Sequence, residues 1–353
     1  MDLHTAVSVS MLAVSRGRAA AIFKDLRDSP DAIDGVLDAS GIDPAGRAAM
    51  ADAARFAADA ALRAAPAAGM EPIPWFDVRY PFLLSCIVDP PPVLWTRGDP
   101  AVLARPAVAV VGSRAATSYA LDVGERLGSE LADRGIVVAS GLARGVDSAA
   151  HRGCLDARGL TAAVLGSGLD TIYPPEHEEL AATIARRGVL VSELGPGAPP
   201  LPDHFPLRNR IISGLSLGVV IVEASEKSGS LITARCAMEQ GRDVMAVPGS
   251  VLSGRNRGSH ALLKDGAKVV ETADDILEEL GWPGAARTVQ SDAKLLDSDP
   301  LLEKLDAGET YGLDELVEAT GIAPSRLLPR LMELELRGQV LSAAGGRFRR
   351  VVT

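Results

Sequence analysis

Seven short apolar segments, separated by stretches with helical periodicity, constrain the fold of this chain more than any other feature. They are rich in Val, Ile and Ala and occur as AVAVVGS (107–113), IVVAS (136–140), TAAVLGS (161–167), VLVSE (189–193), GVVIVEA (218–224), VMAV (244–247) and KVVE (268–271). Apolar strands that alternate with helices pair in parallel, and the helices then cover both faces of the sheet. We therefore expect an α/β fold, with an extended Rossmann-like, doubly wound and mostly parallel sheet.

Smaller units are expected on both sides of this sheet, because 353 residues exceed the length at which one core usually stays undivided. Residues 1–69 are Ala-rich, with breaks at Ser29-Pro30 and at 40–44, and predict a small all-helical domain. The sheet domain is expected over 70–281, and its proline-rich first part, 70–106, predicts an extended lead-in packed against the sheet. The polar stretch 282–299 is typical of a linker.

The C-terminal segment, 300–353, predicts a winged-helix domain. Helix-length pieces near 301–305 and 313–319 are followed by a turn at 320–322, a helix over 324–337 and a hairpin in QVLSAAGGRFRRVV. Gly321, in the turn between two amphipathic helices, gives the arrangement of a helix-turn-helix. The helix after that turn contains Pro329 and few basic residues, which favours packing or a protein partner over DNA contact.

The charge of the chain requires that any polyanion site be local. The net charge is −10, and between residues 106 and 280 there are 17 Lys and Arg against 22 Asp and Glu. Binding to phosphates nevertheless needs Lys or Arg close to them. Six arginines fall in predicted loops while many acidic residues fall on predicted helices, so one basic rim can coexist with an acidic average.

Several classes of protein are disfavoured. No apolar run approaches the ~18 residues of a membrane span, and the N-terminal apolar stretch lacks the basic start of a signal peptide, so we expect a cytoplasmic protein without membrane insertion. The three cysteines and five histidines lack metal-ligand spacing, and neither a G-x-S-x-G string nor a phosphate loop occurs. We therefore expect no metal, no cofactor and no catalytic residues.

The loops that follow the strands are the candidate site, because ligands of open parallel sheets bind beyond the carboxyl ends of the strands. Gly112-Ser113-Arg114 follows the first strand and leads into a helix whose N–H groups and dipole favour a phosphate. This loop lacks the later glycines of G-x-G-x-x-G and places Arg114 where a pyrophosphate would approach, which disfavours NAD. Arg144 lies in a second small-residue loop, after the second strand.

Three further segments extend the candidate site. The arginines of 208–210 can make bidentate phosphate contacts, with interdomain salt bridges as the alternative. Segment 228–233 opens a helix with N–H and O–H donors. The loop 248–258 adds two arginines, for which mobility without function is an equal alternative. The candidate phosphate-binding residues are Gly112, Ser113, Arg114, Arg144, Arg208, Asn209, Arg210, Ser228, Gly229, Ser230, Thr233, Arg255 and Arg257.

These motifs, in this order, resemble the bacterial DNA processing protein A family, also called Smf or DprA. The resemblance runs from about Tyr80-Pro81 to about Leu280, more than half of the chain. The segments that carry it are VAVVGSR, VVASGLARGVDSAAH, TAAVLGSGLDTIYPPEH, HFPLRNRIISGLS and EASEKSGSLITARCAMEQGRDVMAVPG. Unrelated Rossmann folds are not expected to share this joint pattern.

The resemblance implies a single-stranded DNA-binding protein of natural transformation and recombination, which protects incoming DNA and helps to load the RecA recombinase onto it. It also implies that the protein is not an enzyme, that it forms a homodimer through the Rossmann domain, and that the Gly-Ser-Arg loop and neighbouring basic residues hold the DNA. The N-terminal helices resemble the helical extension of the family, although only Ser15-Arg16-Gly17-Arg18 is similar to a helix-hairpin-helix glycine pattern.

Two other hypotheses remain open from the sequence. One is a nucleoside-monophosphate phosphoribohydrolase of the lysine-decarboxylase-like Rossmann type, for which Arg235 and Glu239 are the nearest match to the expected string. The other is a structural adaptor that works through its winged helix and N-terminal helices, and which predicts no DNA affinity in the central domain.

Overall fold

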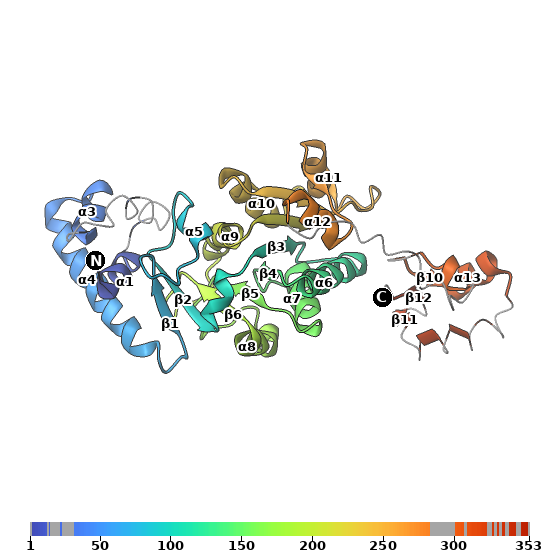
Figure 1. Cartoon of the computed structure of the whole chain (residues 1–353), viewed down its shortest axis with the longest axis horizontal. Coiled ribbons are helices and arrows are strands. Elements are labelled where there is room, and N and C mark those ends of the chain that lie inside the picture. Colours follow the sequence, from blue (N-terminus) through green and yellow to red (C-terminus); the bar gives the residue numbers. More distant parts are fainter. Residues whose placement is uncertain are drawn as a thin grey trace.

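The computed structural model describes residues 2–12, 14, 22, 32–282, 301–306, 309–322, 327, 330–331, 334–335, 339–343 and 347–351. Its centre is one nine-stranded sheet with helices on both faces (Figure 1). The N-terminal helices lie beyond one end of this sheet, and the C-terminal domain lies at the opposite end of the molecule. None of the described helices is both long and apolar enough to cross a bilayer.

All seven predicted strands are present and pair in parallel. They are β3 (Ala107–Gly112), β4 (Val137–Ser140), β5 (Thr161–Val164), β6 (Val189–Ser192), β7 (Gly218–Val222), β8 (Asp243–Ala246) and β9 (Lys268–Val269). Their order across the sheet is β6-β5-β4-β3-β7-β8-β9. The chain winds outward from β3 to β6, returns to the other side of β3, and winds outward again from β7. The strand order therefore reverses between β3 and β7, where such sheets have their binding crevice.

Alternate side chains of each strand enter two different cores, as the period of two in a strand requires. On β3, Val108 and Val110 pack with α6 (Ser118–Asp133) and α7 (Val146–Asp156). Ala109 and Val111 pack on the other face with α9 and α10. The remaining helices of the domain are α8 (Glu178–Arg187), α9 (His204–Gly214), α10 (Ser230–Glu239), α11 (Arg257–Lys264) and α12 (Ala273–Glu279).

The proline-rich lead-in adds two strands that the sequence did not predict. β1 (Glu71–Pro74) pairs antiparallel with β2 (Val93–Gly98), which pairs antiparallel with β6. The short helix α5 (Phe82–Ser85) lies between them in the chain, and the 3₁₀ helix η1 (Pro100–Ala104) follows β2. Prolines hide β1 in the sequence because they cannot donate to a ladder, but β1 is the edge strand, where proline is tolerated. The lead-in is thus part of the sheet itself.

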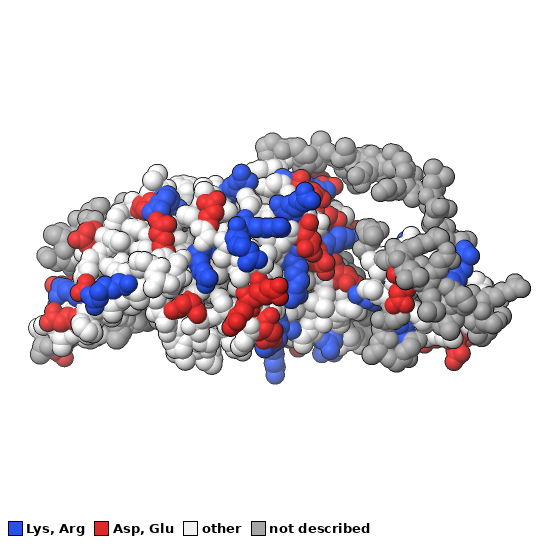
Figure 2. All heavy atoms as spheres, turned by 90° about the horizontal axis from the view of Figure 1, so that it is seen from below, with Lys and Arg blue, Asp and Glu red and all other residues white. Residues whose placement is uncertain are grey.

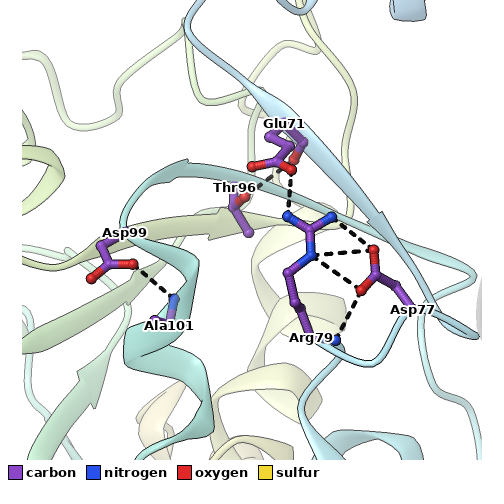
Figure 3. Close-up of polar contacts among 6 residues, drawn as sticks. All are labelled: Glu71, Asp77, Arg79, Thr96, Asp99 and Ala101. Carbon is purple, nitrogen blue, oxygen red and sulfur yellow. Dashed lines mark hydrogen bonds and ion pairs between the residues drawn. The ribbon is translucent and has the colours of Figure 1, made fainter.

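Arg79 ties the loop after β1 back to that strand. Its guanidinium lies between two carboxylates, with Nη1 2.5 Å from Glu71 Oε1 and Nη2 2.7 Å from Asp77 Oδ2 (Figure 3). Hydrogen bonding from Arg79 holds the pKa of Asp77 below its ordinary value. On the neighbouring strand, Thr96 donates to the carbonyl oxygen of Glu71 at 3.2 Å. Because these charges are partly exposed, the network positions the loop more than it stabilises the fold.

The N-terminal helices are α1 (Leu3–Ser10), α3 (Ala32–Ala39) and α4 (Pro44–Ala64). The predicted break at 40–44 is present, and Asp43 caps α4 by accepting a hydrogen bond from the backbone N–H of Gly46 at 2.8 Å. The other predicted break and the segment 15–18 lie outside the described residues. These helices share a continuous core with Trp95 of β2 and Leu190 of β6, so they pack directly on the sheet domain.

The C-terminal residues agree with the predicted winged helix. The η3 turn (Leu302–Lys304) precedes α13 (Leu313–Thr320), which ends at Gly321 with φ +67°, the left-handed conformation that glycine favours. β11 (Val340–Ala343) and β12 (Arg347–Arg350) form the predicted hairpin, and β10 (Tyr311–Gly312) pairs with β12. Most of the predicted helix over 324–337 and nearly all of the predicted linker lie outside the described residues, and the domain limits stay predictions.

Candidate nucleic-acid interface

A cleft of about 610 Å³ lies where the strand order reverses, beyond the carboxyl ends of β3 and β7. It is bounded by the loop after β3, the first turns of α9, and the loop that leads from β7 into α10. The polar and charged residues that line it are Ser113, Arg114, Asp147, Tyr173, Arg208, Asn209, Ser225, Ser228, Ser230 and Thr233. The crevice expected from the topology is therefore present, and most of the predicted site residues meet there.

The loop after β3 presents Arg114 to the cleft. Gly112 precedes it, and a Cβ at this position would lie 1.9 Å from the carbonyl oxygen of Val222, so only glycine lets β3 and β7 end so close together. The Arg114 guanidinium lies 5.4 Å from the centroid of the Phe205 ring, within the range of a cation–π contact. No carboxylate among the described residues forms an ion pair with Arg114. It is the cation of this cleft that is most available to a ligand.

The start of α6, expected to offer free N–H groups to a phosphate, is partly occupied by the protein itself. The carboxylate of Glu223, buried at the end of β7, accepts hydrogen bonds from the Thr117 backbone N–H at 3.1 Å and from its hydroxyl at 2.5 Å. Thr117 in turn caps α6 by accepting from the backbone N–H of Ala120. Glu223 therefore holds Thr117 in place and competes with an anion at that helix start, so the geometry gives less support to an anion site at the start of α6.

At the start of α10 the backbone N–H groups find partners within the turn itself: Ser230 N–H donates to Ser228 Oγ at 3.4 Å, and the next two N–H groups donate to the Ser228 and Gly229 carbonyl oxygens at 3.1 Å. The N-cap of α10 is Gly229, which provides no side-chain cap, and its first turn contains no acidic residue. The hydroxyls of Ser228 and Ser230 lie 2.7 Å apart, and Asn209 Nδ2 donates to the Gly229 carbonyl oxygen at 3.3 Å. A Cβ on Gly229 would meet nothing within 4 Å, which leaves the backbone open to the cleft. The exposed backbone at Gly229, the serine hydroxyls and the helix dipole make this end of α10 suited to an anion.

Arg208 lies in α9, not in a loop as predicted, and it is buried. Its Nη1 donates to the carbonyl oxygens of Gly141, at 2.6 Å, and Val164. Burial lowers the pKa of Arg208 to about 10. A Cβ on Gly141 would lie 2.2 Å from Arg208 Nη2, so the glycine of the second strand-end loop makes room for this guanidinium. Arg208 forms part of the cleft floor and joins the ends of β4 and β5.

Arg210 is also in α9 and buried, and its charge is already matched. Its Nη2 lies 2.6 Å from Glu193 Oε2 and its Nε 3.1 Å from Asp89 Oδ2. The prediction of successive phosphate contacts by both arginines of 208–210 therefore finds no support in the geometry, and the salt-bridge alternative describes Arg210. Its partner Asp89 belongs to the lead-in, so this ion pair connects the lead-in to α9 and β6.

The other three predicted arginines are exposed but lie outside the main cleft. Arg144 pairs with Glu176, with 2.5 Å between Nε and Oε1. Arg255 donates from Nη1 to the Ala115 carbonyl oxygen at 2.7 Å, and Arg257 begins α11 rather than lying in a loop. On the face seen in Figure 2, Lys and Arg lie among Asp and Glu without separating into fields of one sign. Of the six predicted arginines, Arg114 and Arg208 are the two that line the main cleft.

Sequence reasoning missed two aromatic residues and underrated one acid. Tyr173 and Phe205 line the cleft with ring centroids 5.4 Å apart, and each stands next to a proline in the sequence, TIYPPEH and HFPLR. Asp147, in the first turn of α7, is buried and accepts from the backbone N–H of Gly141 at 3.0 Å, and burial raises its pKa. All three residues could have been identified from their positions in the sequence, because each lies in a segment that follows or precedes a strand-end loop.

Comparisons with known proteins agree on one family. The family model described as DNA recombination-mediator protein A matches residues 71–281, and a model described as DprA winged helix domain matches residues 285–346. Protein Smf of Escherichia coli is 42% identical over 76% of this chain and 75% of its own length. DNA processing protein DprA of Bacillus subtilis is 45% identical over 60% of this chain and 72% of its own.

Two solved structures are similar as well. DNA processing protein A from Streptococcus pneumoniae superposes with a TM-score of 0.71 at 37% identity, covering 79% of this chain and 98% of that one. The protein of the same name from Helicobacter pylori, solved to show its single-stranded DNA binding mode, gives 0.54 at 30% identity over 60% of this chain and 95% of that one. Sequence and structure thus point to the same relatives.

Proposed function

This chain belongs to the DNA recombination-mediator protein A family, and we propose that it binds single-stranded DNA by holding the backbone in the cleft between β3 and β7. The observation that carries the proposal is the placement of Arg114: an exposed guanidinium, without an ion pair to any described carboxylate, lines the same cleft as the start of α10, whose first turn has no acidic residue. A phosphate between them would receive N–H and O–H donors on one side and a cation on the other. The single-stranded DNA binding mode described for the Helicobacter pylori protein supports the same ligand.

The proposed contact residues are those that line the open cleft. We assign phosphate contact to Gly112, Ser113, Arg114, Asn209, Ser228, Gly229, Ser230 and Thr233. Arg144, Arg255 and Arg257 are exposed and would contact the strand as it leaves the cleft. Arg208 forms part of the cleft floor, and Arg210 supports α9 through its ion pairs with Asp89 and Glu193. The rings of Tyr173 and Phe205 offer a surface on which an unpaired base can stack, which double-stranded DNA cannot use.

The test is the affinity of Arg114→Ala for an oligonucleotide, measured by fluorescence anisotropy over a range of salt concentrations. A lost hydrogen bond to a charged group predicts at least about a tenfold weaker binding. On single-stranded DNA, the slope of the logarithm of the binding constant against the logarithm of the salt concentration should become shallower by ~0.7. Arg186→Ala, an exposed arginine of α8 outside the cleft, is the matched control and should bind like the wild type. Unchanged affinity of Arg114→Ala would remove the cleft from the interface.

The partners follow from the same proposal. We propose that the protein acts in the cytoplasm as a homodimer, joined through the Rossmann domain, that protects incoming DNA and loads RecA onto it during transformation and recombination. Light scattering tests the dimer. Loading is tested by measuring RecA assembly on an oligonucleotide that is coated with a single-strand binding protein. The wild type should accelerate this assembly, and Arg114→Ala should not. If the wild type does not accelerate assembly, the protein binds DNA without loading RecA.

The enzyme and adaptor hypotheses receive less support. Arg235 and Glu239, proposed for a phosphoribohydrolase, are exposed on α10 and do not line the cleft. Release of free base from nucleoside monophosphates would revive that activity. The adaptor hypothesis predicts that the central domain has no affinity for DNA. It would be supported if a fragment of residues 70–285 did not bind an oligonucleotide that the whole chain binds.

A further inference from the structure

The loop between β8 and α11, residues 248–256, carries two adjacent aliphatic side chains that face solvent. Val251 is 78% exposed and Leu252 93% exposed. Single exposed aliphatic residues are common on protein surfaces and need no explanation. Here two neighbouring aliphatic residues lie at the tip of one loop and form a small apolar surface. Arginines at 255 and 257 follow them in the sequence and place positive charge beside it.

The base of this loop is held firmly, so the tip is presented in a defined place. The Tyr119 hydroxyl donates to the Pro248 carbonyl oxygen at 3.1 Å, and His260 Nε2 lies 3.1 Å from the Gly249 carbonyl oxygen. Asn256 is buried against Gly249, where a Cβ would lie 2.4 Å from the asparagine side chain. The contacts anchor residues 248, 249 and 256 and leave the two aliphatic side chains outside.

The loop stands next to the cleft. Arg255 Nη1 donates to the carbonyl oxygen of Ala115, the residue after Arg114, at 2.7 Å. Just past the loop, in α11, the backbone N–H of Gly258 donates to the carbonyl oxygen of Ala224, just after β7, at 2.7 Å. The loops after β3 and β7 both line the cleft, so a strand leaving the cleft on this side passes the loop.

We propose that Val251 and Leu252 contact the bases of the single strand next to the cleft, as an apolar wedge between neighbouring bases. This inference rests on the proposed function, because it needs a backbone held at Arg114. A strand gripped by its phosphates leaves its bases unpaired, and aliphatic side chains can insert between base steps and unstack them. A nucleic acid is favoured over a protein partner because the apolar area is limited to two side chains, with cations beside it that suit phosphates.

The experiment compares Val251→Ser/Leu252→Ser with the wild type on two probes: an oligonucleotide carrying 2-aminopurine, and one of equal length whose central nucleotides are abasic. On the wild type, 2-aminopurine emission rises on binding because the base is unstacked, and abasic DNA binds about threefold to tenfold more weakly. The double variant should lose most of the emission change and discriminate less between the two probes, while stacking on Tyr173 and Phe205 keeps a residual preference for DNA with bases. Val78→Ser, also exposed at 98% but on the lead-in, is the matched control and should behave as the wild type.

The outcomes separate this inference from the proposed function. Arg114→Ala should weaken binding to both probes, because the phosphate contact does not depend on bases. If the double variant keeps the emission change and the preference for bases, the wedge is wrong even though the cleft binds DNA. If it instead loses only self-association or RecA loading, the tip serves a protein surface, and the inference is equally overturned.

Discussion

The rim of the cleft and the helix beneath it both contain arginines, but these arginines do opposite things. On the rim, Arg114 is exposed, lies over the Phe205 ring and forms no ion pair with a described carboxylate. In α9, Arg208 is surrounded by backbone carbonyls and Arg210 by two carboxylates. The comparison teaches that residue type and closeness in sequence do not identify a ligand-binding cation. What decides is whether the protein has already supplied the matching negative groups.

The largest effect is expected from the buried region. Arg210→Met would leave Asp89 and Glu193 without their cation, and removing one partner of a buried ion pair costs about 3–5 kcal/mol in the free energy of unfolding. Urea denaturation measures this as a lower midpoint. Arg257→Met, which is exposed at the start of α11, should stay within about 0.5 kcal/mol of the wild type.

The pH dependence of the same variant sharpens the assignment. Burial raises the pKa of Asp89 even with Arg210 present, so the folded state binds its proton more tightly than the unfolded state does. Stability from this group is therefore greatest at low pH and falls as pH rises through the raised pKa. Without Arg210 that pKa rises further, and the stability deficit should grow toward neutral pH. A deficit that is constant with pH, or a variant of normal stability that loses DNA, would contradict the structural role.

Two glycines give the next contrast. Gly141→Ala would bring a Cβ within 2.2 Å of the Arg208 guanidinium, whereas Gly229→Ala meets nothing within 4 Å. We expect the first to lose about 1–3 kcal/mol of stability through overpacking. The second should lose about 1 kcal/mol or less. Thermal unfolding measures both. Equal losses would mean that Arg208 yields to the added methyl and is not fixed by the two carbonyls.

The sheet was predictable because its signal is local. Five of the seven parallel strands, β3 to β7, are mainly apolar runs in which every residue is buried, and nothing in the tertiary structure overrides that pattern. β1 was missed for the opposite reason: its prolines oppose a strand locally, and only its edge position, which is a tertiary fact, permits it. The predicted winged helix likewise followed from local signals, such as the glycine turn at Gly321.

The location of the site could be predicted from the sequence, but the contacts that each of its residues makes could not. The rule that ligands bind beyond strand ends gave the cleft and Arg114. It could not separate Arg114 from Arg208 and Arg210, because the groups that neutralise those two come from distant segments: Asp89 from the lead-in, Glu193 after β6, and carbonyls of β5 and the loop after β4. The role of Glu223 was hidden in the same way, since its partner Thr117 is 106 residues away.

A smaller effect tests how the rim arginine is oriented. Phe205→Leu removes the ring that lies 5.4 Å from the Arg114 guanidinium. Loss of an exposed cation–π contact predicts about a two- to fivefold weaker binding to single-stranded DNA. In the double variant with Arg114→Ala, the two losses should be less than additive, because the ring then has no cation to hold. Full additivity would show that Phe205 contacts the DNA on its own, by stacking on a base.

The smallest effect is expected for Arg144, which combines the exposure of the rim arginine with the ion pairing of the buried arginines. Arg144 is exposed like Arg114 but paired like Arg210, and hydrogen bonding from it lowers the pKa of Glu176 below the ordinary value of 4.5. The pair therefore stays charged throughout the neutral range, and Glu176→Gln should free the arginine equally at about pH 6 and pH 8. If Arg144 then contacts a phosphate, the slope of the logarithm of the binding constant against the logarithm of the salt concentration becomes steeper by ~0.7. This change is opposite in sign to the one expected for Arg114→Ala. An unchanged slope would place Arg144 outside the interface and leave Arg114 as the cation that decides affinity.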